Sequence, residues 1–174
     1  MNKPKNISLS AVDAIVFDFD GVLTNNQVLI DQDGKEIVCC SRADGLAFDM
    51  LRKTSVKLFI LSTETNSVVT QRGKKLRVPV FQGSKDKRKA LEELCKRENL
   101  PVQKILYVGN DVNDYSAMQI SGFSACPADS HPRILKIATF KLKTKGGHGI
   151  VRELVEEVFE IDLINYEPGG NTPA

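Results

Sequence analysis

The chain has 174 residues, of which 41% are hydrophobic, 26% charged and 6% aromatic. This length favours one domain that buries about 70% of its unfolded surface, so its core needs no disulfide or structural metal. The 24 basic and 22 acidic residues nearly balance, which gives no electrostatic reason to expect nucleic acid or a membrane surface as a partner. No apolar run approaches the roughly 18 residues of a membrane helix, and Met1–Ser10 lacks a signal-peptide core. We therefore expect a cytoplasmic protein.

The four cysteines are not spaced like metal ligands. Cys39 and Cys40 are adjacent, Cys95 and Cys126 stand alone, and no C-x-x-C pair occurs. Adjacent residues of a strand point to opposite faces, so Cys39 and Cys40 would not act together. Free thiols in a reducing compartment are favoured over a zinc site or a disulfide framework.

Short apolar strands and longer amphipathic helices alternate along the first half of the chain. The turn residues Asp31–Gly34 lie between two apolar segments, which indicates a β-hairpin over Gln27–Cys40. Asp44 is a candidate N-cap for a helix over Gly45–Arg52. The other predicted elements are strands at Val12–Asp18, Val56–Leu61 and Val78–Phe81 and a helix at Thr65–Lys75.

The second half continues this alternation. The predicted helices are Ser84–Glu98, Asp111–Ser121, Pro132–Ile137 and Ile150–Phe159, and the predicted strands are Lys104–Val108, Phe123–Ala125 and Phe140–Leu142. The pattern is typical of an α/β fold, here a three-layer Rossmann-like parallel sheet with an inserted hairpin. We expect a single domain over residues 1–165 and a flexible C-terminal tail over 166–174, which has no hydrophobic periodicity.

Polar residues of several chemical types follow the predicted strands. Asp18 and Asp20 follow the first strand, Ser62 follows the second main strand, and an acidic loop over 110–114 follows a later one. Lys87 lies near the start of the long helix. Because ligands of parallel sheets bind beyond the carboxyl ends of the strands, we expect these groups to meet at one edge.

Such a set of groups suits phosphoryl transfer. Oxygen ligands gathered without His or Cys suit Mg²⁺, and a lysine with a serine suits the oxygens of a phosphoryl group. Each group also has an ordinary structural interpretation: an Asp pair in a turn, Ser62 as a helix cap, Lys87 on a solvated face, and the acidic loop as a cap. The order of the four along the chain favours the chemical interpretation.

The segments Asp18–Thr24, Leu61-Ser62, Lys87 and Gly109–Asp114 resemble the four motifs of the haloacid dehalogenase superfamily of phosphatases. By this resemblance Asp18 is the nucleophile, Asp20 is the general acid and base, and Ser62 and Lys87 hold the phosphoryl oxygens. The resemblance implies further contacts, as follows: Mg²⁺ ligands from Asp18, the backbone carbonyl of Asp20, and Asn110 or Asp111; support from Asp114; and substrate contacts from Thr24, Arg42, Asp44 and Thr63.

Two narrower groups share more of the sequence. The hairpin, Ser41–Gly45 and Gly146–Glu153 resemble phosphatases of 3-deoxy-D-manno-octulosonate 8-phosphate, whereas Leu61–Asn66 and Val108–Asp114 resemble the phosphatase domain of bacterial acylneuraminate cytidylyltransferases. The resemblance implies a sugar-acid phosphate of lipopolysaccharide or sialic acid synthesis as substrate, and a homotetramer. Asn110 stands where the octulosonate enzymes usually have Asp, and Thr63-Glu64 where they tend to have Gly-Arg, which favours a nonulosonate 9-phosphate.

The spacing of the motifs leaves no room for a cap domain. Forty-one residues separate Asp20 from Ser62, and 24 separate Ser62 from Lys87, and both intervals are filled by predicted elements. We expect a neighbouring subunit to supply a lid. One alternative is a catalytically weak or inactive relative that serves as an oligomerisation or regulatory module of a cytidylyltransferase system, which Asn110 favours. A phosphoacceptor signalling domain is disfavoured, because its phosphorylated Asp follows a middle strand.

Overall fold

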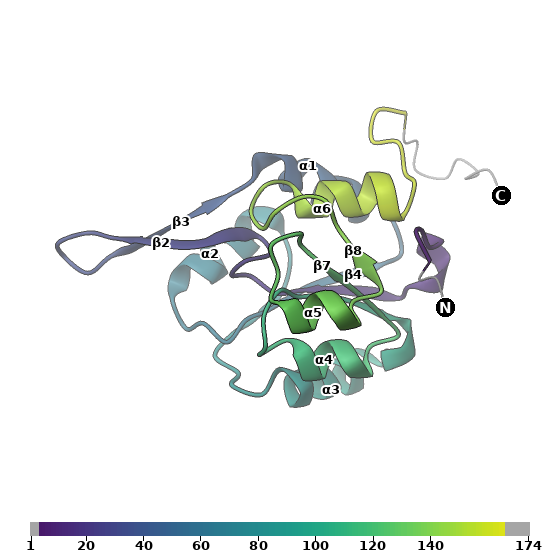
Figure 1. Ribbon diagram of the computed structural model, residues 1–174, viewed down its shortest axis with the longest axis horizontal. Helices are drawn as coiled ribbons and strands as arrows, with labels where there is room; N and C mark the ends of the chain where they lie inside the picture. Colours follow the sequence, from purple (N-terminus) through teal and green to yellow (C-terminus); the bar gives the residue numbers. More distant parts are fainter. Residues whose placement is uncertain (1–3, 166–174) are drawn as a thin grey trace.

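The computed structural model describes residues 4–165. A six-stranded parallel sheet in the order β5-β4-β1-β6-β7-β8 lies between two layers of helices, and a separate two-stranded hairpin extends from the body (Figure 1). The predicted α/β fold, the parallel sheet and the inserted hairpin are confirmed. The predicted C-terminal tail at 166–174 lies outside the described residues.

The sheet is built from short, buried strands. Its strands are β1 (Ala14–Phe17), β4 (Lys57–Leu61), β5 (Val80–Phe81), β6 (Ile105–Val108), β7 (Phe123–Cys126) and β8 (Phe140–Lys141), and the hairpin strands are β2 (Thr24–Ile30) and β3 (Glu36–Cys40). In β1, Ile15 and Phe17 face one helical layer while Ala14 and Val16 face the other. This alternation explains why both faces of the central strand are apolar.

The helices divide between the two faces. The bounds of the helices are α1 (Arg42–Leu51), α2 (Ser67–Leu76), α3 (Lys87–Glu98), α4 (Tyr115–Ile120), α5 (Pro132–Ile137) and α6 (Ile150–Glu153), the last continuing as a π-helical turn over Leu154–Val158. Figure 1 shows α1 and α6 above the sheet and α3, α4 and α5 below it. Phe48 of α1 packs edge-on against Phe17 of β1, with ring centroids 5.1 Å apart, and burying such a side chain contributes about 1.5–3 kcal/mol.

Capping side chains place the helix starts differently from the prediction. Ser41, rather than Asp44, caps α1, because its side chain accepts a hydrogen bond from Ala43 N. Asn66 caps α2 in the same way, so Ser62 is not a helix cap. The last predicted helix, Ile150–Phe159, is α-helical only to Glu153 before the wider turn begins.

The intervals between the motifs hold only the elements of the fold. The hairpin, α1 and β4 lie between Asp20 and Ser62, and α2 and β5 lie between Ser62 and Lys87. Within residues 4–165 there is therefore no inserted cap domain. No helix in this same range is long and apolar enough to cross a membrane.

Candidate active site

Three neighbouring strands end at one edge of the sheet, and each is followed by a predicted site residue. Asp18 follows β1, Ser62 follows β4 on one side of it, and Asn110 follows β6 on the other after one glycine. The ladder continues beyond the strands, since Asp18 N donates to Val108 O at 2.8 Å. The predicted convergence at the carboxyl ends of the strands is confirmed.

Lys87 is buried between two carboxylates. Its Nζ lies 2.6 Å from Asp18 Oδ1 and 2.6 Å from Asp114 Oδ1, and the residue is 1% exposed. Burial opposes the charge of Lys87, but Asp18 and Asp114 raise its pKa above the ordinary value. Lys87 is therefore a fixed cation beside Asp18 and does not lie on a solvated face.

Asp114 positions both Lys87 and the loop after β6. Its Oδ1 accepts a hydrogen bond from Tyr107 OH at 3.0 Å as well as from Lys87. Its Oδ2 accepts from the backbone N–H groups of Asn110 at 2.9 Å and Asp111 at 3.2 Å. Because it is fully buried and all four partners are fixed, it sets where the lysine and the loop lie.

The environment of Asp18 opposes its ionisation. Burial and, after it, the Asp114 carboxylate raise the pKa of Asp18, which is about 8 once all its neighbours are included. Lys87 and the N–H of Phe19, which donates to Asp18 Oδ1 at 2.7 Å, act in the opposite direction. A further cation near this carboxylate would favour its ionised form, since opposite charge lowers a carboxyl pKa.

Asp20 is half-buried and is held by Thr24. The Thr24 hydroxyl donates to Asp20 Oδ1 at 3.3 Å and accepts a hydrogen bond from Gly21 N at 3.2 Å. Burial raises the pKa of Asp20, and the Thr24 hydrogen bond partly offsets this rise. Gly21 has φ of +80°, and a Cβ there would lie 2.0 Å from Asn110 Nδ2, so this turn requires glycine.

Three oxygens, one each from Asp18, Asp20 and Asn110, converge at one point of the site. The side-chain oxygen of Asn110 faces Asp18 Oδ2 and the backbone carbonyl oxygen of Asp20 with no hydrogen between them. If the amide were turned over, its nitrogen would lie 3.2 Å and 2.9 Å from these two oxygens and would donate to both. The first orientation offers a set of oxygen ligands that fits Mg²⁺.

The other described carboxylates do not form a metal cluster of their own. Across residues 4–165, no three His, Cys, Asp or Glu side chains are arranged to hold a metal ion. In the oxygen set above, one ligand is an amide and another belongs to the backbone, so only Asp18 contributes a carboxylate. The Asp111 side chain accepts a hydrogen bond from Val112 N at 2.7 Å in its own loop.

The carboxylates open into a small cavity of about 170 Å³. Its lining residues come from the loops after β1 and β6, the start of the hairpin and the end of β4: Asp18, Asp20, Asn26, Thr63, Asn110, Asp111, Val112 and Asn113. Ser62 is 1% exposed, and its hydroxyl accepts a hydrogen bond from Glu64 N at 3.0 Å. At this volume the cavity has room for a phosphoryl group, and it opens to solvent on the side of Asn26 and Val112, which are exposed.

Three of the four predicted substrate-binding residues lie outside the lining of this cavity. Arg42 is exposed on the first turn of α1 and lines a different hollow with Arg72 and Lys75 of α2. Asp44 is 1% exposed, and its Oδ1 accepts hydrogen bonds from Val151 N at 2.8 Å and Arg152 N at 3.4 Å. Asp44 therefore joins α1 to the start of α6. Thr24 is fully buried and holds Asp20 from behind the cavity, so Thr63 is the one of the four that lines it.

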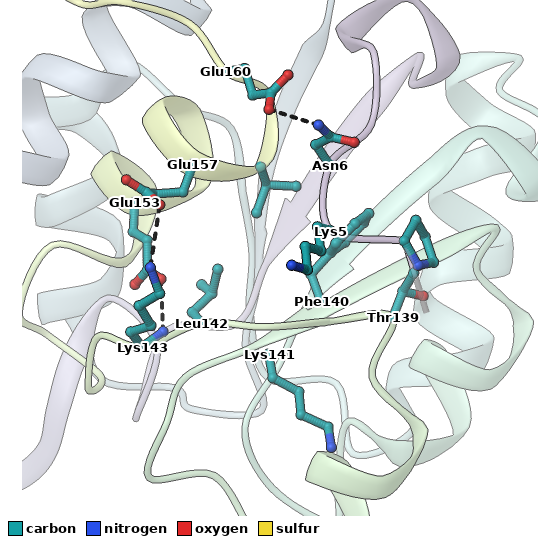
Figure 2. Close-up of a pocket in the computed structure, with 12 residues that line it drawn as sticks. Lys5, Asn6, Thr139, Phe140, Lys141, Leu142, Lys143, Glu153, Glu157 and Glu160 are labelled. Carbon is teal, nitrogen blue, oxygen red and sulfur yellow. Dashed lines mark hydrogen bonds and ion pairs between the residues drawn. The ribbon is translucent and has the colours of Figure 1, made fainter. Parts of the chain in front are cut away.

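A larger cavity, of about 730 Å³, shares no residue with the site (Figure 2). It lies at the β8 edge of the sheet, beside the N-terminal segment and α6. Its charged side chains largely engage one another or nearby polar groups: Lys143 lies 3.4 Å from Glu157, and Asn6 donates to Glu160 at 2.7 Å. Phe140 and Leu142 line its apolar part. Size alone does not identify the reactive site in this molecule.

Tyr107 and Asn26 contribute to the site but are missing from the sequence-based prediction. Tyr107 lies inside an apolar strand and looks like core, although a phenol in a buried strand needs a polar partner, which was a usable signal. Asn26 lies two residues after the end of the first motif. Its contribution depends on a left-handed backbone, with φ of +60°, and no spacing rule predicts that conformation.

Comparison with known proteins identifies the family. The haloacid dehalogenase-like hydrolase family matches residues 48–154 of the chain. Among curated proteins, the chain is similar to the 3-deoxy-D-manno-octulosonate 8-phosphate phosphatase of Escherichia coli, with 27% identity over 157 residues that cover 90% of this chain and 81% of the relative. It is 26% identical to N-acylneuraminate cytidylyltransferase A of Danio rerio over 90% of its length, but spans only 36% of that protein.

Solved structures give the same result. A proposed HAD family hydrolase from Streptomyces avermitilis superposes with a TM-score of 0.87 and 38% identity, covering 91% of this chain and 97% of that one. The 3-deoxy-D-manno-octulosonate 8-phosphate phosphatase of Moraxella catarrhalis, solved with a magnesium ion, a phosphate ion and a KDO molecule, has a TM-score of 0.81 at 26% identity over 84% of each chain.

Proposed function

The chain belongs to the haloacid dehalogenase-like hydrolases and is a phosphatase, and from this premise we propose that it dephosphorylates an eight- or nine-carbon 2-keto-3-deoxy sugar acid. The candidate substrates are octulosonate 8-phosphate and an acylneuraminate or other nonulosonate 9-phosphate. The observation that carries the proposal is Lys87 held 2.6 Å from Asp18 beside a cavity that Asp20 also lines. Similarity to octulosonate phosphatases and to an acylneuraminate enzyme supports the substrate class.

The proposed reaction has two displacements at phosphorus. A carboxylate oxygen of Asp18 attacks the phosphorus, the ester P–O bond breaks, and Asp20 gives its proton to the departing sugar oxygen. The Asp20 carboxylate then takes a proton from a water whose oxygen attacks the aspartyl-phosphate. Inorganic phosphate leaves and Asp18 is restored, so each residue ends as it began. The raised pKa of Asp20 suits a group that must hold a proton before the first step.

Neighbouring groups hold the phosphoryl oxygens during this exchange. Lys87 offers a buried ammonium and Ser62 a hydroxyl, as expected for charge neutralisation at a transferring phosphoryl group. Mg²⁺ would be held by Asp18, the backbone carbonyl of Asp20 and Asn110, with Asp111 the other side chain of that loop within reach of the cavity. When bound, the ion supplies positive charge against the phosphoryl oxygens. The amide of Asn110 is neutral, so we expect weaker metal binding than with a carboxylate there.

A homotetramer is part of the same proposal. The hairpin exposes four apolar side chains, with Leu29 68%, Ile30 65%, Ile37 56% and Val28 47% exposed. Exposed apolar surface of this kind typically marks an interaction site. We infer that the hairpins of neighbouring subunits pack together, and that a neighbour closes the open side of the catalytic cavity.

A phosphate-release assay tests the function. Wild-type protein with Mg²⁺ is given octulosonate 8-phosphate, nonulosonate 9-phosphates, hexose phosphates and p-nitrophenyl phosphate, with and without EDTA. We expect turnover of a sugar-acid phosphate, its loss with EDTA, and a fall of about 1,000-fold or more in Asp18→Asn, because an amide is not a nucleophile. Asp13→Asn makes the same change at an exposed surface pair with Lys104 and serves as the matched control.

The same assay separates a second candidate function. One observation favours a module for assembly or regulation of a cytidylyltransferase system: Asn110 places a neutral amide against the metal-binding oxygens. That candidate predicts no turnover of any substrate in the panel. Substantial activity of Asp18→Asn would instead contradict the aspartyl-phosphate mechanism while leaving the family assignment intact.

A further inference from the structure

Asn26 occupies an unusual backbone position at the mouth of the catalytic cavity. It lies where the hairpin register shifts between Thr24 and Val28, an irregularity of the ladder that resembles a β-bulge. Its φ is +60°, in the left-handed region that glycine adopts freely and other residues rarely do. Bulges beside active sites commonly redirect a side chain. Glycine would suit this backbone better, so the presence of an asparagine side chain here requires a reason.

The backbone around Asn26 is tied to the acid and base residue. Asn26 N donates to Thr24 Oγ1 at 3.3 Å, and the same hydroxyl donates to Asp20 Oδ1. Glycine would make the same backbone hydrogen bond with less steric cost. The amide of Asn26 is thus not needed to build the bulge, and its placement needs another explanation.

A second asparagine shows what the conformation alone requires. Asn99 has φ of +54° and ends α3, where its N–H donates to Cys95 O and Lys96 O. Asparagine is a common left-handed residue at a helix end, so the position of Asn99 at the end of α3 explains its backbone conformation. Asn26 lies at no helix end. What distinguishes it is that its side chain lines the cavity with Asp18 and Asp20.

The exposed residues of the cavity lining are uncharged, namely Asn26, Val112 and Asn113, in contrast to the more buried carboxylates of Asp18 and Asp20. Asn26, Asn113 and Thr63 line the cavity together with the carboxylates. The Asn26 amide is exposed and makes no side-chain hydrogen bond within residues 4–165. A primary amide both donates and accepts, as a sugar hydroxyl does, and it carries no charge to attract the phosphoryl group.

We propose that Asn26 is a specificity-determining residue that exchanges hydrogen bonds with a hydroxyl of the departing sugar, close to the ester oxygen. The inference deepens the proposed function and rests on it, because it assigns the leaving-group side of the same site. The chemical class recognised is a polyhydroxylated phosphate ester, of which sugar-acid phosphates are the favoured members. Placing this amide at the cavity mouth requires the left-handed backbone, which is sterically unfavourable for any residue other than glycine.

The test compares Asn26→Gly with the matched control Asn99→Gly. Both variants replace a left-handed asparagine with glycine, so both keep the backbone and relieve the same steric cost, and neither should lower the melting temperature. Asn26→Gly should raise KM for the best sugar-acid phosphate about 3- to 10-fold, the loss expected for one or two hydrogen bonds. The rise should be clearly smaller for p-nitrophenyl phosphate, whose leaving group has no such hydroxyl. Asn99→Gly should change neither KM.

Three results would overturn the inference: unchanged KM for the sugar-acid phosphate, an equal rise for both substrates, or the same rise in Asn99→Gly. An equal rise would mean that the amide supports the loop and not the leaving group. If the wild type hydrolyses p-nitrophenyl phosphate but no sugar-acid phosphate, the proposed substrate class fails. Glucose 6-phosphate then replaces the sugar acid in the same comparison, so Asn26 is still tested.

Discussion

At the scale of single residues, Asp44 differs in role from the carboxylates of the site. It is buried between α1 and α6, and only its Oδ1 has hydrogen-bond partners, while its Oδ2 has none within residues 4–165. Burial raises the pKa of Asp44 from 3.8 to about 6, and the N–H groups of Val151 and Arg152, with the charge of Arg72, only partly oppose the rise. At neutral pH the ionised carboxylate of Asp44 therefore lowers the free energy of unfolding.

This cost predicts a pH dependence of stability that Asp44→Asn removes. Because the folded pKa lies above the unfolded one, the contribution of Asp44 is fully present below about pH 3.8 and is lost as pH rises through about 6. Asparagine keeps the acceptor oxygen and does not titrate. The stability of Asp44→Asn relative to wild type should therefore rise by about 2 kcal/mol between pH 4 and pH 7.5. Urea unfolding of both proteins across this range measures it, and parallel pH profiles would contradict it.

Sequence patterns predict the residues of the site better than their surroundings. Asp18, Asp20 and Asn110 are predicted from their order at strand ends and Lys87 from its place at the next helix start, and the sheet topology brings them together. Tyr107 acts only through a contact with Asp114 seven residues later. The partners of Asp44 are 107 and 108 residues away, and such distant pairs leave no local pattern in one chain.

At the scale of elements, the glycine-rich loop before α6 supports the first motif. Gly147 N donates to Val22 O at 2.9 Å. A Cβ on Gly146 would lie 2.2 Å from Gly21 O and 3.0 Å from Thr24 O. Both obstacles are backbone atoms of the turn that carries Asp20, so the two loops are in direct contact at a point where only glycine fits.

Gly146→Ala should therefore disturb catalysis more than an ordinary helix substitution. The added methyl group must displace the Gly21 turn, which moves the Asp20 carbonyl, so we expect a rate loss of about 10-fold or more and about 1–3 kcal/mol of destabilisation from overpacking. The Mg²⁺ concentration for half-maximal activity should also rise. Steady-state kinetics over a Mg²⁺ series and urea unfolding measure these effects.

Gly45→Ala is the matched control for this change. Gly45 lies within α1, and nothing lies within 4 Å of a Cβ built there, so alanine should stabilise the helix by about 0.5–1 kcal/mol and leave the kinetics as they are. Equal kinetics in Gly146→Ala and Gly45→Ala would show that the glycine loop does not position the first motif.

Element types were predictable because strand and helix periods differ, whereas element ends depend on capping contacts. The helix after the hairpin starts at Arg42 instead of Gly45, since Ser41 supplies the cap and Asp44 turns towards α6. Apolar periodicity continues through Leu154–Val158, but the backbone widens there, with Phe159 N donating to Leu154 O. Nothing in the sequence marks that π-helical turn.

At the scale of the whole molecule, the cavity is small and the hairpin is long. Figure 1 shows the hairpin extending well beyond the body that contains the sheet, although the cavity of about 170 Å³ lies at its base. Leu29 and Ile37 are direct cross-strand partners, which places both on one face of the ribbon. A two-stranded ribbon with an exposed apolar face is marginally stable by itself, which favours a partner in solution.

The proposed assembly predicts the effect of charging this face. Leu29→Lys combined with Ile37→Glu replaces an apolar cross-strand pair with one of opposite charges, so the hairpin itself should persist, while burial against another apolar ribbon becomes costly. Sedimentation velocity should show a tetramer for the wild type and monomers for the double variant. Ile164→Lys, at a site 90% exposed and outside the hairpin, should leave the tetramer intact.

Because a neighbour is expected to close the cavity, kcat/KM of the double variant for the sugar-acid phosphate should fall more than its kcat/KM for p-nitrophenyl phosphate. A wild type that is monomeric and fully active would rule out both the tetramer and the shared lid.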